Sequence, residues 1–252
     1  MARIEEVEET HVVPPVRSAA KKKAEPTPSS KPSPTGTLTK YYLALYNFLS
    51  SLAWLYVLFL TLQHLLTPNP HSPTDSLLER LSTTYNAVGH QTALVQSAAA
   101  MEVLHAATGL VRSPISTTVV QVWSRYQLVW GVAYVFIEAQ TTPFYATMVL
   151  SWSITEVIRY THYTLTLLSV PSSVLLYLRY TTFYLLYPTG AGSEAFVIRA
   201  TLPASPGLYE PGDWLRAMFF VAWWPGLALM MMHMQAQRSK ALGSGKKKAK
   251  TE

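Results

Sequence analysis

The stretch YYLALYNFLSSLAWLYVLFLTLQHLL, residues 41–66, decides the fold class. It contains no Asp, Glu, Lys or Arg, and a helix needs about 20 residues to cross the hydrocarbon layer of a bilayer. The stretch is longer than that, so it predicts a membrane-spanning helix. A second clear apolar run, AMFFVAWWPGLALMMMHMQAQ, covers residues 217–237. Its Pro225-Gly226 pair predicts a kink, which neighbouring helices in a membrane bundle can accommodate.

Charged residues are scarce and gather at the two ends of the chain. Asp, Glu, Lys and Arg make up 13% of the 252 residues, about half of what a soluble domain carries. All ten lysines lie at or before Lys40 or at or after Lys240. A surface that faced water would carry charge between these positions. The net charge of +6 therefore belongs to the tails, and the singly scattered interior arginines exclude a nucleic-acid groove.

Four weaker apolar segments lie between the two clear runs, at residues 91–111, 117–137, 141–163 and 168–188. Each holds one or two charged side chains: Glu102, Arg125, Glu156, Arg159 and Arg179. A charge in mid-membrane is costly and usually faces the bundle interior, so Arg125 and Arg179 are expected to pair with Glu102 or with backbone carbonyls. The sequence predicts an all-α, polytopic membrane bundle of about six transmembrane helices. Four to seven crossings remain compatible with these segments.

The basic tails set the predicted orientation and the division of the chain. Basic flanks favour the cytosolic side, so both termini are predicted to be cytosolic, and the loop at about 67–89 is predicted to be translocated. Residues 1–38 are expected to form a disordered cytosolic tail, residues 39–238 the transmembrane domain and residues 239–252 a basic cytosolic tail. Lys248 and Lys250 match the dilysine retrieval pattern of endoplasmic reticulum proteins; the alternative is a merely solubilising tail.

The block Tyr187-Pro-Thr-Gly-Ala-Gly-Ser-Glu194 is the first candidate for chemistry. Pro188, Gly190 and Gly192 predict that the preceding helix ends here. Such a break leaves backbone amides free to bind an oxygen-rich group. A phenol and a carboxyl flank the turn, and a carboxyl in an apolar setting can move a proton near neutral pH. The alternative is an interfacial tyrosine followed by a solvated glutamate, and composition alone favours that alternative.

The second candidate is WSITEVIRYTHY, residues 152–163. On a helix, its Trp, Glu, Arg and final Tyr share one face: Trp152, Glu156, Arg159 and Tyr163. Glu156 and Arg159 are three residues apart and can form an ion pair. The pattern indicates either a structural pair that fixes helix register or one wall of an active cavity. The sequence does not separate the two.

The third candidate, HAATGLVRS, has the frame of the tyrosine phosphatase loop His-Cys-x5-Arg, but Ala106 stands where the cysteine belongs. The chain contains no cysteine at all, which excludes phosphatase chemistry through a thiolate. Arg112 could still meet a phosphate at the cytosolic side. The histidines lack the spacing of metal ligands, so no metal and no cofactor are expected.

Three stretches together resemble the very-long-chain 3-hydroxyacyl-CoA dehydratases of fatty-acid elongation, once called protein tyrosine phosphatase-like proteins. They are GLVRSPISTTVVQVWSR (109–125), WSITEVIRYTHY (152–163) and LRYTTFYLLYPTGAGSE (178–194). The resemblance covers about residues 40–240. It implies a lyase that converts (3R)-3-hydroxyacyl-CoA to trans-2-enoyl-CoA. Tyr187 and Glu194 match the family's catalytic pair in Tyr-Pro-x-Gly-x-x-Ser-Glu.

The resemblance also implies an endoplasmic reticulum membrane enzyme that works beside a condensing enzyme and reductases. Candidate substrate-binding residues are Arg112, Glu156, Arg159, Tyr163, Gly190 and Ser193. Six crossings would place Tyr187 toward the lumenal end of its helix, whereas acyl-CoA is cytosolic, and a tunnel entered from the cytosol would reconcile the two. The rival hypotheses are a catalytically silent scaffold, against which the intact pair argues, and a lipid-binding or transport protein, against which the lack of visible repeats argues.

Overall fold

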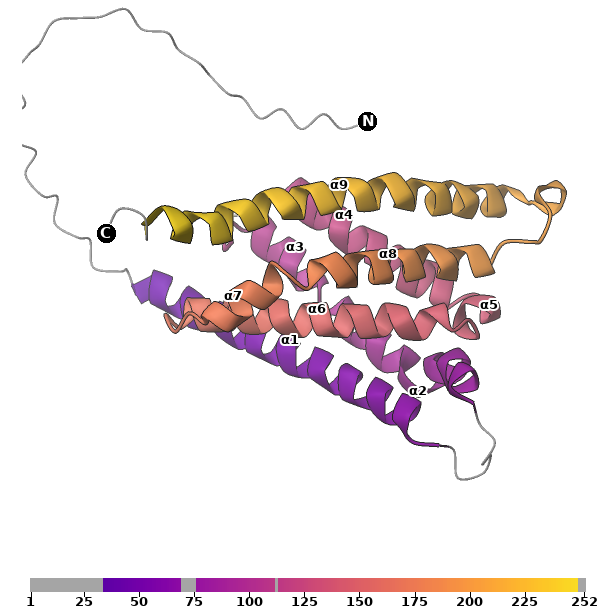
Figure 1. The fold of residues 1–252 in the computed structure, drawn as a ribbon, viewed down its shortest axis with the longest axis horizontal. Helices are drawn as coiled ribbons and strands as arrows, with labels where there is room; N and C mark the ends of the chain where they lie inside the picture. Colours follow the sequence, from indigo (N-terminus) through magenta and orange to yellow (C-terminus); the bar gives the residue numbers. More distant parts are fainter. Residues whose placement is uncertain (1–33, 69–75, 112, 249–252) are drawn as a thin grey trace, which may run out of the picture. The chain divides into compact units, whose positions relative to one another are not determined.

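The computed structural model describes residues 34–68, 76–111 and 113–248, and these residues form helices and connections without a strand (Figure 1). The all-α prediction is therefore confirmed. The longer helices are α1 (Pro34–Leu66), α2 (Leu77–Ser97), α4 (Ile115–Tyr126), α6 (Phe144–Leu167), α8 (Phe183–Ala200) and α9 (Pro211–Lys248). The shorter ones are α3 (Ala100–Ala107), the π-helix η1 (Gln127–Ala133), α5 (Ile137–Gln140), α7 (Ser173–Arg179) and the 3-10 helix η2 (Pro206–Leu208).

Two of these helices are long and apolar enough to cross a membrane by length and composition. They are Gly36–Leu66 within α1 and Pro211–Leu242 within α9, and they contain the two runs that the sequence singles out. Both expose large apolar side chains, among them Leu45, Phe59, Val221 and Leu229. Apolar surface of this extent is typical of a membrane contact, so the structure is compatible with a membrane protein.

The predicted segment 91–111 begins too late. Helix α2 begins at Leu77, inside the stretch that the sequence predicts as a loop, and it breaks before α3. The Ser76 side chain caps the start by accepting a hydrogen bond from the Glu79 amide at 3.2 Å. Buried polar side chains on α2, Thr84, Thr92 and Gln96, face the bundle. Their polarity lowers the hydropathy of a helix that is packed inside, which is why the sequence pattern misses it.

The predicted helix 168–188 is also wrong at both ends. The chain forms α7, turns at Tyr180–Thr182, and then forms α8, which continues through Pro188, Gly190 and Gly192 to Ala200. The expected helix break at the proline is therefore absent. Packing against α6 overrides the local propensity, because small residues let two membrane helices approach closely and hydrogen-bond. A Cβ on Gly190 would lie 3.3 Å from the Ser151 Cβ.

Polar side chains join α6 and α8 on both sides of this close approach. The Ser151 and Thr189 hydroxyls are 3.0 Å apart, and the Thr147 and Ser193 hydroxyls are 2.6 Å apart. Neighbouring groups of this kind allow proline and glycine to persist in membrane helices. We call this contact, made by Thr147, Ser151, Thr189, Gly190 and Ser193, the α6–α8 seam.

The start of α1 and the end of α9 lie at the same end of the bundle. Lys40 Nζ donates to Ser169 Oγ at 3.2 Å, just after α6, and Arg238 of α9 donates to the Tyr180 carbonyl between α7 and α8. We call this the tail end (Figure 1, where α1 begins and α9 finishes on the same side). Helix α8 starts at the tail end, so Tyr187 lies near it. The expected position of Tyr187 at the opposite end is wrong, because the chain turns before α8 rather than at Pro188.

Candidate active site

Tyr187 and Glu194 occupy the same face of α8. They are seven residues apart, which is two helical turns, and their Cα atoms are separated by about 10 Å along the axis. Helix α8 lies between α6 and α9, and both neighbours contribute side chains that touch this face. The structure thus places a phenol and a carboxyl in line rather than on two sides of a turn.

Two tryptophans hold the Glu194 carboxyl. Trp152 Nε1 on α6 donates to Oε1 at 2.6 Å, and Trp223 Nε1 on α9 donates to Oε2 at 2.8 Å. The Arg125 guanidinium lies over the Trp152 ring, 4.7 Å from its centroid, so the positive charge stands behind the indole. Neutral donors orient the carboxyl without a direct ion pair, and each oxygen keeps a further lone pair for a ligand.

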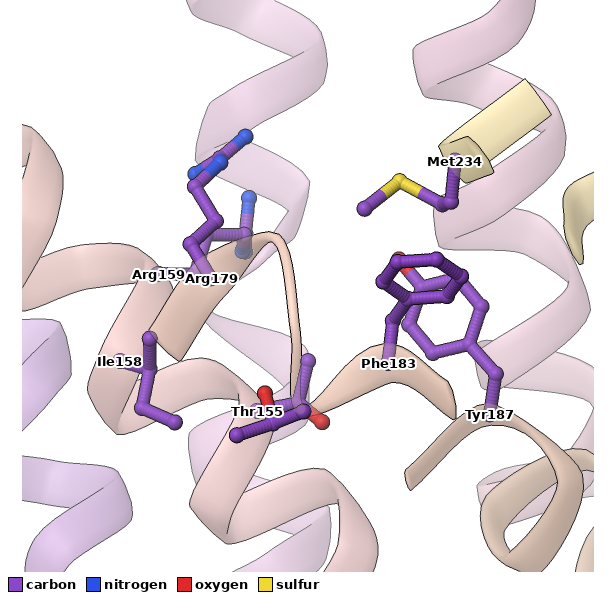
Figure 2. A pocket seen from close by; sticks show the side chains of 8 residues that line it. Thr155, Ile158, Arg159, Arg179, Phe183, Tyr187 and Met234 are labelled. Carbon is purple, nitrogen blue, oxygen red and sulfur yellow. The ribbon is translucent and has the colours of Figure 1, made fainter. Parts of the chain in front are cut away.

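Tyr187 lines a pocket of about 60 Å³ near the tail end. Figure 2 shows Phe183, Tyr187 and Met234 on one side and Arg159, Arg179, Ile158 and Thr155 on the other; Thr182 also lines it. Among the described residues, the Tyr187 hydroxyl has no hydrogen-bond partner, which leaves it available to a ligand. Glu194 lies outside this lining, two turns further along α8. Met234 of α9 is part of the pocket.

A paired set of charges lies beside the pocket. Glu156 is 3% exposed and accepts hydrogen bonds from Arg125 and, at 2.6 Å, from Arg159 Nε. The terminal nitrogens of Arg159 donate to Glu102 at 2.7 and 3.1 Å, and the Tyr160 hydroxyl also donates to Glu102. We call these five residues the paired-charge network. The expected pair of Glu156 with Arg159 is confirmed, whereas the expected partner of Arg125 is wrong: it is Glu156, across from α4 to α6.

The other predicted site residues fall into three places. Tyr163 lies at the tail end, where its hydroxyl accepts a hydrogen bond from Arg179 Nη2 at 2.8 Å; the expected partners of Arg179, Glu102 or a carbonyl, are therefore wrong. Gly190 and Ser193 belong to the α6–α8 seam and face α6. Arg112 lies outside the described residues. Of the predicted residues, Arg159 lines the pocket at Tyr187, whereas Glu156 contacts Arg159 and Tyr163 contacts Arg179 behind the lining.

Sequence reasoning missed two contributors to the site, Trp223 and Arg179. Trp223 is 29 residues from Glu194 in the chain and meets it only because α9 runs antiparallel to α8. No spacing signal marks it, although an indole inside an apolar run needs an acceptor for its N–H. In the described residues, no group of three or more His, Cys, Asp or Glu side chains is placed to hold a metal ion. What the site offers is a proton acceptor and a phenolic donor on one helix face.

Comparisons with known proteins point to one family. The family model described as "Protein tyrosine phosphatase-like protein, PTPLA" matches residues 96–244. A Schizosaccharomyces pombe protein named as a probable very-long-chain (3R)-3-hydroxyacyl-CoA dehydratase is 37% identical over 204 residues, which cover 79% of this chain and 91% of that protein. A Caenorhabditis elegans very-long-chain (3R)-3-hydroxyacyl-CoA dehydratase is 36% identical over 221 residues, covering 82% and 97%.

An Arabidopsis thaliana dehydratase of the same name is 35% identical over 222 residues, covering 82% of this chain and 96% of that protein. No solved structure matches the chain.

Proposed function

The chain belongs to the protein tyrosine phosphatase-like family, whose relatives are named very-long-chain (3R)-3-hydroxyacyl-CoA dehydratases, and we propose that it removes water from such a substrate with Tyr187 and Glu194. The product is the trans-2-enoyl-CoA, and the reaction is that of a hydro-lyase in fatty-acid elongation. The observation that carries the assignment is the placement of an oriented carboxyl and an unpartnered phenol on one face of α8.

The reaction needs a base for the C2 proton and an acid for the C3 hydroxyl. Glu194 takes the proton from C2, and the electron pair of that C–H bond forms the new C2=C3 bond. The C3–O bond breaks, and the departing oxygen receives the Tyr187 proton and leaves as water. A proton that returns from Glu194 to Tyr187 through water restores both groups. The opposite assignment of base and acid gives the same products, and Tyr187 could also donate to the thioester carbonyl.

The partners of Glu194 support its role as the base. A carboxylate that is ion-paired with arginine is held in its charged form and is a weaker proton acceptor. Glu156 is in that situation, because two guanidinium groups bind its two oxygens. Glu194 receives two neutral N–H donors instead, so it is oriented while it keeps more of its basicity.

The arrangement of the helices supports six crossings with both termini in the cytosol. Successive long segments run between the tail end and the opposite end, where His64 of α1 hydrogen-bonds the Arg80 carbonyl of α2 at 3.0 Å. The dehydratase domain would then cover residues 39–238 between the cytosolic tails 1–38 and 239–252. We propose an endoplasmic reticulum location, because the relatives are named as very-long-chain 3-hydroxyacyl-CoA dehydratases, and the condensing enzyme and reductases of the elongation cycle are the expected partners.

A cytosolic tail end gives the substrate a direct route to Tyr187. The CoA portion stays in water, while the acyl chain gains about 0.8 kcal/mol for each methylene that it buries. The pocket at Tyr187 has room for a few water molecules and not for an acyl chain. Its apolar walls include Ile158, Phe183 and Met234, and the flexible methionine side chain can move to widen it.

The test is dehydration of a very-long-chain (3R)-3-hydroxyacyl-CoA by the purified full-length protein in detergent. We expect Glu194→Ala and Tyr187→Phe each to reduce turnover by at least about 100-fold, since general acid–base groups contribute that much, while the yield of monodisperse protein stays normal. Tyr184→Phe is the matched control, because Tyr184 is an exposed tyrosine one turn away on α8. Near wild-type turnover by either variant would show that the pair is misassigned. A wild-type protein without turnover would favour the silent scaffold or the lipid-binding protein.

A further inference from the structure

Arg179, the last residue of α7, lies in the pocket wall across from Tyr187 (Figure 2). Resting on the proposed function, we propose that Arg179 binds the diphosphate of the CoA moiety at the tail end of the pocket. The proposal goes beyond the catalytic pair, because it assigns the subsite that holds the non-reacting part of the substrate.

The charge of Arg179 has no acidic partner among the described residues. Its Nη2 donates to the Tyr163 hydroxyl at 2.8 Å, and its guanidinium lies over the Tyr163 ring at 4.6 Å. Its Nη1 is covered and, within the part of the chain that the structure describes, has no hydrogen-bond partner. A covered donor without an acceptor costs free energy, and phosphate oxygens bind guanidinium groups through short, charge-assisted hydrogen bonds.

Arg159 lines the same pocket, but its charge is already neutralised. It donates to both Glu156 and Glu102, so a phosphate would have to displace a carboxylate. Arg159 is a candidate substrate-binding residue from the sequence, but phosphate binding by Arg159 is therefore less favourable than phosphate binding by Arg179. Arg159 therefore belongs to the paired-charge network, and Arg179 is the pocket arginine that remains for the ligand.

The distance between Arg179 and the catalytic carboxyl suits the CoA moiety. Helix α6 holds both groups: Trp152 binds Glu194 and Tyr163 binds Arg179. At 1.5 Å per residue, Trp152 and Tyr163 are about 16 Å apart along the helix axis. The extended pantetheine arm, which joins the thioester to the diphosphate, spans a separation of this size. Tyr187 lies between the two levels.

Two further cations lie at the tail end. Arg238 donates to the Tyr180 carbonyl, and Lys40 donates to Ser169. Positive side chains gathered at one end of the bundle attract a polyanion and raise its local concentration. A membrane phospholipid also carries a phosphate, but Arg179 faces the pocket that contains Tyr187 rather than the outer surface of the bundle, and this favours the phosphate of the substrate.

The experiment compares acyl-CoA with the acyl-pantetheine thioester, which lacks the diphosphate. We expect Arg179→Gln to raise KM for the hydroxyacyl-CoA by about 10- to 100-fold with little change in kcat. The charge-assisted contact with the diphosphate is made in both the ground state and the transition state, so its loss weakens substrate binding without slowing the chemical step. KM for the hydroxyacyl-pantetheine should stay at its wild-type value. Arg179→Lys should recover part of the effect. Arg199→Gln, at the opposite end of α8, removes the same charge and should change neither substrate.

A second measurement does not depend on turnover. Free CoA should bind the detergent-solubilised wild-type protein, and salt should weaken that binding because it screens charge; Arg179→Gln should abolish it. The proposal is overturned if Arg179→Gln changes both thioesters equally, which would indicate a packing role, or if its effect appears only in nanodiscs that contain anionic lipid, which would indicate a headgroup site. If the wild-type protein binds CoA through Arg179 but dehydrates neither thioester, the proposed function fails and this inference stands.

Discussion

Glu156 and Glu194 are both carboxylates inside the bundle, yet their partners are of opposite kinds. Two arginines bind Glu156, and two tryptophans bind Glu194. A full ion pair compensates the cost of a buried charge and leaves little capacity for proton transfer. Neutral donors fix the position of a carboxylate and preserve more of that capacity. The comparison separates a charge that joins helices through ion pairs from a charge to which we assign the proton transfer.

The arginines of the pocket repeat the same contrast. Arg159 is bound to Glu102 and Glu156, whereas Arg179 has a phenol as its partner and one unpartnered nitrogen. In both comparisons the ion-paired member belongs to the network that joins α3, α4 and α6. The member without an ion pair among the described residues lies where we propose that the substrate binds. The charge of the partners is therefore the feature by which we propose to distinguish structural from functional charges in this bundle.

The largest expected effect comes from opening the paired-charge network. Glu156→Ala leaves two guanidinium groups without their shared acceptor, and breaking a buried pair in this way costs about 3–5 kcal/mol of stability. We expect a much lower melting temperature in detergent and a poor yield of monodisperse protein. Glu194→Ala leaves two indole N–H donors without their acceptor but no charge without its partner, so it should lower the melting temperature clearly less than Glu156→Ala does. Equal melting temperatures for the two variants would refute the division between them.

The next effect concerns the α6–α8 seam, which sets the distance between the helices that carry the two glutamates. Gly190→Ala adds a Cβ at 3.3 Å from the Ser151 Cβ, and overpacking of this kind costs about 1–3 kcal/mol. Gly192→Ala is the control, because nothing lies within 4 Å of the added Cβ. An alanine in that open helical position should stabilise by about 0.5–1 kcal/mol. The measurement is thermal unfolding of both variants in the same detergent, and a similar loss for both would show that the seam is not tightly packed.

Local features of the fold could be predicted from the sequence, and contacts between helices could not. Uninterrupted apolar runs predict α1 and α9 because length and hydropathy are local properties. The continuity of α8 through Pro188 depends on the partner surface of α6, which no local rule describes. The start of α2 is not predicted either, because the polar residues of this helix face neighbouring helices in the interior rather than an exposed surface.

The candidate site shows the same limit. The spacing of Glu156 and Arg159 predicts their ion pair, because both lie on one helix. The hydrogen bonds from Arg125 to Glu156 and from Trp223 to Glu194 join different helices, so spacing in the sequence does not predict them. Tyr187 and Glu194 are found by their motif. Their geometry, two turns of one helix rather than the two sides of a break, comes only from the structure.

The smallest effect tests whether the indoles act by positioning Glu194. Trp223→Phe keeps the ring packing but removes one N–H donor, and the loss of one such hydrogen bond corresponds to about a tenfold change in rate. We expect kcat to fall by about that factor, with KM and the melting temperature near wild type. The neighbouring Trp224, which is 41% exposed and packs on Phe196, provides the control Trp224→Phe.

A purely structural role for Trp223 would lower the melting temperature and leave the kcat of the folded fraction unchanged. Equal kcat values for Trp223→Phe and Trp224→Phe would likewise contradict positioning through the N–H. A selective fall in kcat would instead show that the carboxyl depends on a neutral donor for its orientation. The same test cannot be made at Glu156, because removing either of its arginine partners would destabilise the bundle and obscure an effect on kcat.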